Sequence, residues 1–284
     1  MIRLSAFADE ASKDVAGQIA ALKRNRIPYI ELRGLDGVNI SKITLEQAKE
    51  YAALFEKEGI RVWSIGSPIG KIKIDDDFEG EKATLRHICR LANIFGTDRI
   101  RMFSFFESYE KEETVMKYLR EMVAIAAEEG CSLYHENEKL IFGDTLERVE
   151  KIMEKVEGLK FIYDPANYIE AGEAAETTLN ALHGRTHYFH IKDILADTRQ
   201  IVPAGKGDGR IGDLVARIAP EADVTLTLEP HLKLFDGYSG FDSTELKNKY
   251  EFATETESFD AAVSALKEIL VQEGYQEIEG GWIK

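Results

Sequence analysis

The feature that most constrains the fold is a repeated alternation between short β-rich segments and longer segments of helical periodicity. The pattern occurs eight times along the chain. The β-rich segments favour strands, and apolar residues three and four positions apart favour amphipathic helices. Predicted strands cover residues 2–8, 28–32, 60–65, 99–105, 131–136, 160–164, 186–191 and 224–229. Predicted helices cover a segment capped by Ser12, then residues 44–58, 77–95, 113–128, 145–156, 175–182, 211–218 and 258–272.

Strands that alternate with helices pair in parallel through right-handed crossovers. Eight such units in 284 residues predict an α/β fold of the (β/α)₈ type, a TIM barrel. The main rival, a doubly wound open sheet, usually has a glycine-rich first turn. The first turn here reads Asp9-Glu10-Ala11-Ser12, which argues against a dinucleotide site.

The chain is predicted to form a single barrel domain over residues 1–284, because no Gly/Ser-rich or Pro-rich linker divides it. One segment, residues 231–257, is rich in Tyr, Phe, Gly and Asp. It is too long for an ordinary connection between barrel elements. We expect it to be a lid over the barrel, a subunit contact or a loose loop.

The charge balance argues against nucleic-acid binding. Asp and Glu total 51 against 36 Lys and Arg, for a net charge of −15, and no basic run concentrates positive charge. The apolar stretches fall short of the roughly 20 residues that a spanning helix needs. The N-terminal segment lacks the pattern of a signal peptide. With two cysteines inside apolar segments, we expect a cytoplasmic protein with packed thiols and no membrane partner.

Residues of metal-ligand type stand at the carboxyl ends of four successive predicted strands. They are Glu136, Asp164, His190 and Glu229. Active sites of TIM barrels lie at this end of the strands. Side-chain alternation supports a common direction, because the aliphatic residues in 224–228 share one face and Glu229 lies on the other. The four side chains are therefore predicted to converge on the barrel axis.

Three carboxylates and one imidazole suit a divalent ion such as Mn²⁺, Mg²⁺, Co²⁺ or Zn²⁺. In a confined space the carboxylates would repel each other, and a dication relieves most of that repulsion. A single acidic residue at a strand end is more often a helix cap, and a single buried His is more often a core residue. Four on neighbouring strands favour a metal site. No H-E-x-x-H motif is present.

Several segments resemble the xylose isomerase-like barrel superfamily. Besides the strand ends, they read Phe7-Ala8-Asp9-Glu10, Ile30-Glu31-Leu32-Arg33, Ser64-Ile65-Gly66-Ser67-Pro68-Ile69-Gly70-Lys71 and Arg101-Met102-Phe103-Ser104. They are most similar to the sugar phosphate isomerase/epimerase-like group. The superfamily also contains inosose dehydratases and an endonuclease branch. The likeness runs from the first predicted strand to the eighth.

The resemblance implies one divalent ion, with Mn²⁺ as the first expectation, bound by Glu136, Asp164, His190 and Glu229. It also implies that Glu136 and Glu229 form the catalytic acid/base pair. The implied activity is that of an isomerase of carbohydrate metabolism, a ketose epimerase or aldose–ketose isomerase. It would act on a sugar or sugar phosphate by proton transfer through an enediolate.

Three alternatives stay open. Loss of a β-hydroxyl from the same enolate would make the protein an inosose-type dehydratase. A barrel that binds a metabolite without catalysis is the second alternative. The third, a metal-dependent nuclease, is disfavoured because the endonuclease branch uses a richer set of histidines than the six found here.

Five further residues are predicted to bind a small sugar-like substrate: Asn167, Lys192, His231, Arg101 and Glu31. The glycine-rich segment 204–209 follows the seventh predicted strand, where barrels often place a phosphate loop. Its amides are expected either to face an anion or to belong to a mobile turn. A homo-oligomer is compatible with all of these features.

Overall fold

A computed structural model describes residues 1–233, 247–248 and 250–284. Eight parallel strands follow one another around a barrel in chain order, and the last pairs with the first over Ile2–Ala6 and Val224–Leu228. The predicted TIM barrel is therefore confirmed. Its strands are β1 (Ile2–Ala6), β2 (Tyr29–Leu32), β5 (Arg61–Ile65), β6 (Arg99–Met102), β7 (Ser132–Glu136), β8 (Lys160–Tyr163), β9 (Tyr188–Ile191) and β12 (Val224–Leu228).

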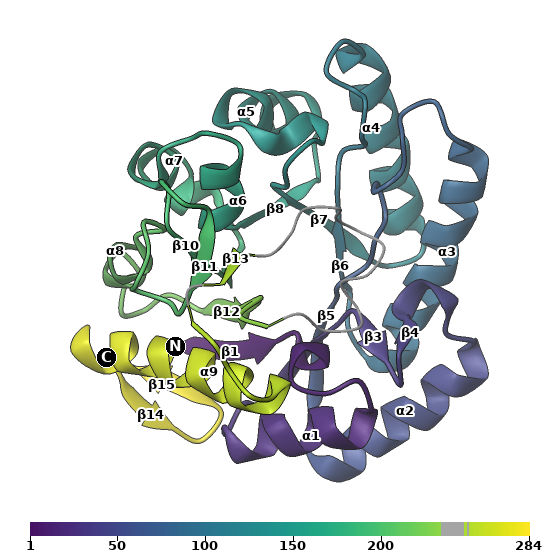
Figure 1. Ribbon diagram of the computed structural model, residues 1–284. Coiled ribbons are helices and arrows are strands. Elements are labelled where there is room, and N and C mark those ends of the chain that lie inside the picture. The colour runs from purple at the N-terminus through teal and green to yellow at the C-terminus, as the bar shows by residue number, and fades with distance from the viewer. Residues whose placement is uncertain (234–246, 249) are drawn as a thin grey trace.

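Helices form an outer ring around the strands (Figure 1). They are α1 (Val15–Arg24), α2 (Leu45–Glu58), α3 (Phe78–Phe95), α4 (Glu112–Glu128), α5 (Leu146–Lys155), α6 (Pro165–Glu170), α7 (Ala175–Leu182), α8 (Ile211–Ala216) and α9 (Glu255–Gln272). Short 3₁₀ turns cover Ala8–Glu10, Ile40–Lys42, Phe142–Asp144 and His183–Arg185. Within the described ranges, no helix is both long enough and apolar enough to span a bilayer.

Local chemistry sets the helix ends. Thr44 and Gln47 form a reciprocal capping box at the start of α2, and Gly59 ends that helix in the left-handed region with φ of 73°. The predicted cap Ser12 is wrong. Asp14 caps α1 by accepting the Gly17 N–H, and the Ser12 hydroxyl donates to Asp14.

Two small sheets and a C-terminal hairpin extend the barrel beyond the predicted elements. A hairpin joins β3 (Gly34–Leu35) to β4 (Val38–Asn39), and β10 (Asp193–Ile194), β11 (Gln200–Val202) and β13 (Lys247–Asn248) form a second sheet. The C-terminal hairpin of β14 (Gln276–Ile278) and β15 (Gly281–Ile283) pairs with the start of β1. In Figure 1 it lies below α9, near the N-terminus. These strands are too short to give a periodic sequence signal.

The barrel interior confirms the predicted side-chain alternation. Tyr134, Ile162 and Tyr188 form a buried cluster, with Trp63 packed against it. Each of the first three lies two residues before a predicted metal ligand, so the ligands point to the same side of their strands. The cluster forms the layer of side chains below the metal ligands.

Most of the segment predicted as a lid, residues 231–257, lies outside the described residues. Its described parts include the buried residues His231 and Leu232. Helix α9 begins at Glu255, three residues before the predicted start. Both cysteines are free and buried, as predicted.

Candidate metal centre

The four predicted metal ligands lie together at the carboxyl end of the barrel. One ligand atom from each of Glu136, Asp164, His190 and Glu229 lies within 4.8 Å of every other. His190 Nδ1 is 2.9 Å from Glu136 Oε1 and 3.1 Å from Glu229 Oε2. All four side chains are buried. Their positions on or just after β7, β8, β9 and β12 explain the convergence, because these strands are neighbours in the closed sheet.

The electrostatics of the cluster favour a cation at its centre. Burial opposes a charge on His190, but attraction to Glu136 and Glu31 outweighs burial and raises the imidazole pKa well above its usual value. Burial raises the pKa of Asp164, and neighbouring Glu136 raises it further, although Lys192 opposes both effects. Crowded carboxylates of this kind are relieved by a positive charge between them.

The residues fit a divalent ion. Asp164 Oδ2 and Glu229 Oε2 are buried, and their contacts in the described part of the chain are ion pairs, with Lys192 Nζ at 3.0 Å and with His190 Nδ1 at 3.1 Å. The other Asp164 oxygen accepts the Asn167 N–H at 3.1 Å, which caps α6 and fixes the carboxylate. Three oxygens and one imidazole nitrogen form a donor set that hard-to-borderline dications accept.

Buried cations surround the carboxylates. Lys192 Nζ lies 3.0 Å from Asp164 Oδ2. Arg101 Nη1 donates to Glu136 Oε2 at 3.1 Å and lies 3.7 Å from Glu229 Oε1. These contacts partly neutralise the cluster and orient its side chains.

The structure brings all five predicted substrate-binding residues into contact with residues of this centre. Asn167 accepts a hydrogen bond from Lys192 at 2.8 Å, and Arg101 contacts the glutamates as described. His231 Nε2 lies 3.5 Å from Glu229 Oε1. Burial lowers the pKa of His231 to about 4, so its ring is neutral near pH 7.

Glu31 lies on the other side of His190. Its Oε2 is 3.3 Å from His190 Nε2, and its Oε1 accepts the Tyr188 hydroxyl at 3.0 Å. The residue is 1% exposed. Because Nε2 faces Glu31, Nδ1 is the nitrogen that faces the metal ligands. This is the carboxylate–histidine arrangement that orients histidine ligands in metal sites.

A second acidic network adjoins the centre, and its residues Asp9 and Glu10 were not predicted as part of the site. Arg33 binds both oxygens of Asp9 at 2.9 and 3.0 Å, and it also donates to Glu10 at 3.1 Å and Glu229 at 3.0 Å. Burial raises the pKa of Glu10 to about 8. Glu10, Glu229 and His231 form a further group that could hold a metal ion. The sequence signal that could have identified this network is the acidic pair Asp9-Glu10, which follows the first predicted strand at the carboxyl end of the barrel.

The glycine-rich segment 204–209 does bind an anion, but the anion is a side chain of the same protein. The Asp193 carboxylate accepts the N–H groups of Gly205, Gly207 and Gly209 at 2.8, 3.0 and 2.8 Å. These amides are therefore occupied, and the interpretation as a phosphate loop is not supported.

Solved structures share this fold across nearly the whole chain. A probable 3-DHS dehydratase, AsbF from Bacillus anthracis, is 17% identical, with a TM-score of 0.70 over 96% of this chain and 99% of that one. IolI protein with a bound zinc atom is 15% identical, with a TM-score of 0.70 over 95% and 99%. D-allulose 3-epimerase from Methylomonas sp. is 16% identical, with a TM-score of 0.68 over 96% and 98%.

No curated protein matches the sequence. A family model described as xylose isomerase-like TIM barrel matches residues 19–231, which include all four residues of the metal centre. The match spans most of the chain and agrees with the closed barrel. The chain therefore belongs to the xylose isomerase-like TIM barrel family.

Proposed function

We propose that this protein is a divalent-metal-dependent isomerase or epimerase of a sugar or sugar phosphate. The proton would move through an enediolate between Glu136 and Glu229. The observation that carries the proposal is the placement of these buried glutamates, whose nearest oxygens lie 2.9 and 3.1 Å from the same His190 nitrogen. Two bases at one centre can serve two faces of one substrate carbon.

Glu136, Asp164, His190 and Glu229 would hold the ion, with Mn²⁺ the first candidate and Mg²⁺, Co²⁺ or Zn²⁺ as alternatives. A bound dication supplies Lewis-acid stabilisation of an enediolate, worth several kcal/mol. Burial raises the pKa of Glu229, but Lys192 and His190 outweigh this effect and hold it well below its usual value. Glu229 is therefore ionised and ready to accept a proton.

Other residues would bind and orient the substrate. The Nε–H of Arg101 is buried and has no hydrogen-bond partner among the described residues, so it can donate to a substrate oxygen. Lys192, Asn167 and His231 line the same centre and offer donors for hydroxyl groups. We assign Glu31 to the positioning of His190, because both its oxygens already accept contacts from protein groups.

A dehydratase that uses the same residues is the second candidate. One structural neighbour is described as a probable 3-DHS dehydratase and another as a D-allulose 3-epimerase. Both outcomes need a base that removes a proton next to a carbonyl. They differ in whether the intermediate is reprotonated or loses a β-hydroxyl.

Solvent exchange tests the proposal directly. Mn²⁺-loaded protein would be incubated in D₂O with a panel of ketoses, ketose phosphates and inososes. We expect deuterium to enter the carbon next to the carbonyl of at least one compound. Glu136→Gln and Glu229→Gln should each slow exchange by about 10²-fold or more.

The matched control is Glu138→Gln, because Glu138 is a nearby half-buried carboxylate that pairs with Lys71 at 2.9 Å. Its exchange rate should stay close to that of the wild type. Exchange that persists in both Glu136→Gln and Glu229→Gln would end the proposal. An unsaturated or deoxy product, identified by mass spectrometry, would favour the dehydratase.

A further inference from the structure

The N-terminal end of the barrel, opposite the metal centre, gathers positive charge in a chain whose net charge is −15. Arg3 on β1, Arg61 on β5, Arg99 on β6 and Lys160 on β8 all lie at this end of their strands. The metal ligands lie at the other end. This concentration of charge therefore plays no part in the proposed chemistry.

A cavity of about 390 Å³ opens at this end. It adjoins a second cavity of about 660 Å³, and Arg3, Trp63 and Arg99 line both. The floor is aromatic, because Tyr134 and Trp63 belong to the layer of side chains below the metal ligands. The residues that line the smaller cavity are Arg3, Trp63, Arg99, Tyr134, His187 and Asp223.

The two arginines of the cavity are held in place. Arg3 forms a two-point ion pair with Asp223, at 2.6 and 2.9 Å, and Arg99 lies over the Trp63 ring at 4.1 Å. Arg99 also lies 3.2 Å from Asp98. The two acidic partners are 62% and 54% exposed, and Asp223 also lines the smaller cavity, where Arg3 neutralises it. Each guanidinium has five N–H donors, and these contacts leave several for a ligand.

Further donors lie in or next to the same cavity: His187 and Trp63 line it, and Lys160 contacts the lining residue Tyr134. Lys160 Nζ contacts the hydroxyls of Ser132 at 3.3 Å and Tyr134 at 3.2 Å, and no carboxylate of the described residues lies within ion-pair distance of it. His187 Nδ1 accepts the Phe161 N–H at 3.2 Å, which leaves Nε2 to carry the proton. The indole N–H of Trp63 is buried and has no partner in the described part of the chain.

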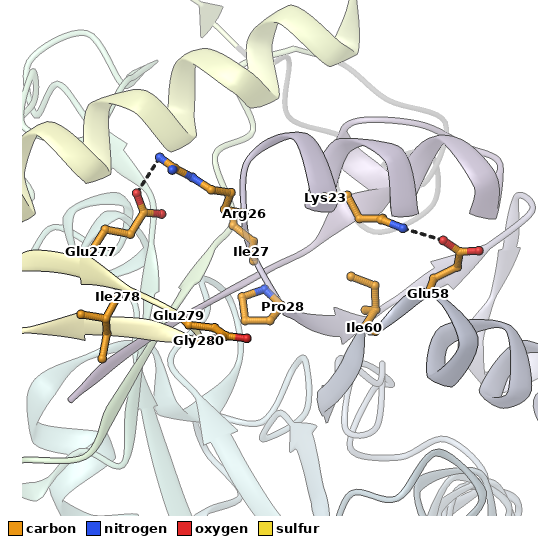
Figure 2. A pocket seen from close by; sticks show the side chains of 11 residues that line it. Lys23, Arg26, Ile27, Pro28, Glu58, Ile60, Glu277, Ile278, Glu279 and Gly280 are labelled. Atoms are coloured by element: carbon orange, nitrogen blue, oxygen red, sulfur yellow. Dashed lines mark hydrogen bonds and ion pairs between the residues drawn. The ribbon is translucent and has the colours of Figure 1, made fainter.

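Another cavity at the same end of the barrel provides a contrast. Figure 2 shows this cavity, where Lys23 pairs with Glu58 and Arg26 pairs with Glu277, each at 2.7 Å. Glu279 also lines it, so its carboxylates outnumber its cations. A surplus of positive charge is therefore a property of the first cavity and not of every hollow at this end.

We propose that the cavity lined by Arg3, Arg99 and His187 binds a small tetrahedral dianion, either inorganic phosphate or the phosphate group of a monoester. Guanidinium groups offer pairs of N–H donors that match phosphate oxygens, and such charged hydrogen bonds are stronger than neutral ones. The cavity volume lies in the range of small-molecule sites. The aromatic floor excludes water from one side of the ligand.

Trp63 provides a local reporter for the test. The chain has two tryptophans, Trp63 and Trp282, so Trp282→Phe leaves Trp63 as the single indole. The EDTA-treated variant would be titrated with inorganic phosphate and with glycerol phosphate at constant ionic strength. We expect a saturable change in Trp63 fluorescence with a Kd in the millimolar range or lower. Isothermal titration of the wild type gives a second readout.

Three variants distinguish a specific phosphate-binding site from non-specific electrostatic attraction of anions. Arg99→Gln and Lys160→Gln should each weaken binding about tenfold or more, because each removes a charged hydrogen bond. Arg26→Gln is the matched control, since it removes one positive charge from the cavity of Figure 2, and it should leave the Kd unchanged.

The outcomes distinguish a phosphate monoester from inorganic phosphate as the ligand, and they include results that would overturn the proposal. Tighter binding of glycerol phosphate than of inorganic phosphate would assign the site to a phosphorylated metabolite, and equal or weaker binding would assign it to phosphate itself. No saturable signal in either readout, an equal response to chloride, or an unchanged Kd in Arg99→Gln would overturn the proposal.

Discussion

At the residue scale, a buried polar side chain of the metal centre is held in position by a hydrogen bond to a second buried side chain. Glu31 holds His190 through Nε2, and the Tyr188 hydroxyl in turn donates to Glu31. This series of hydrogen bonds fixes the ring so that Nδ1 faces the carboxylates of the centre. The ring of a histidine without such support would lose rotational freedom on binding a metal, and that ordering costs free energy.

Replacement of Glu31 should therefore weaken metal binding. We expect Glu31→Gln to lower the affinity for Mn²⁺ by about 10- to 100-fold, because groups that orient a histidine ligand contribute on this scale. Isothermal titration of the metal-free protein measures the effect, and Glu138→Gln serves as the control. An affinity equal to that of the wild type would contradict the positioning role.

His135 gives a prediction on pH. It is buried beside Ser104, and burial lowers its pKa to about 3. A histidine in the unfolded chain titrates near pH 6.5. Below that pH the unfolded chain binds a proton that the folded protein does not, so the free energy of unfolding falls by about 1.4 kcal/mol per pH unit from this residue.

The variant His135→Gln removes this contribution. Its difference in unfolding free energy from the wild type should shrink by about 2 kcal/mol between pH 6.5 and pH 5. Urea denaturation of both proteins at several pH values measures the difference, and titrations that both proteins share cancel. A difference that stays constant over this range would be inconsistent with a neutral buried ring.

At the element scale, one carboxylate organises the connection after β9. Asp193 on β10 accepts N–H groups from Gly205, Gly207 and Gly209 and from the neighbouring Ile194. A Cβ at Gly207 or Gly209 would lie 2.4 or 2.7 Å from Asp193 Oδ1, so the loop closes tightly around the carboxylate. Asp193 thus replaces the external anion that such a loop could bind.

Removal of this carboxylate should loosen the loop. We expect Asp193→Ala to lower the free energy of unfolding by about 3 kcal/mol, because buried N–H groups lose a charged acceptor. The three glycine amides should also exchange with solvent faster, which NMR can follow residue by residue. Asp197→Ala is the control, since Asp197 lies nearby and is exposed. Unchanged protection in Asp193→Ala would contradict the role.

At the scale of the whole molecule, the metal centre joins strands that are distant along the chain. Its ligands extend from Glu136 to Glu229 and belong to four neighbouring strands of the barrel. An ion bound there favours the folded state over the unfolded chain, because the unfolded chain does not bring these ligands together. Binding and stability are therefore linked.

We expect divalent metal to raise the melting temperature. At a free metal concentration of about 100 times the Kd, linkage predicts about 2.7 kcal/mol of added stability, which corresponds to a shift of several degrees. Thermal melts in Mn²⁺ and in EDTA measure the shift. Asp164→Asn should abolish it and Glu138→Gln should keep it. A melting temperature that does not respond to any of the four candidate metals would argue against the site.

Some of the fold and the site could be predicted from local patterns. Period-two and helical alternation identified all eight barrel strands, because burial on one face of an element leaves a regular imprint on the sequence. The short helix α6 escaped prediction because its six residues, Pro165–Glu170, show less than two turns of periodicity. The hairpin of β14 and β15 was also not predicted, because strands of three residues are too short to show alternation.

The sequence by itself determined the barrel and the identity of the four residues at the ends of neighbouring strands, since both depend on spacing along the chain. The tertiary structure decided which partners those residues have. Glu31 and His190 are 159 positions apart, and Arg33 and Glu229 are 196 apart. Such pairs meet only when the barrel closes, because the register between the first and last strands sets which side chains face each other across the axis.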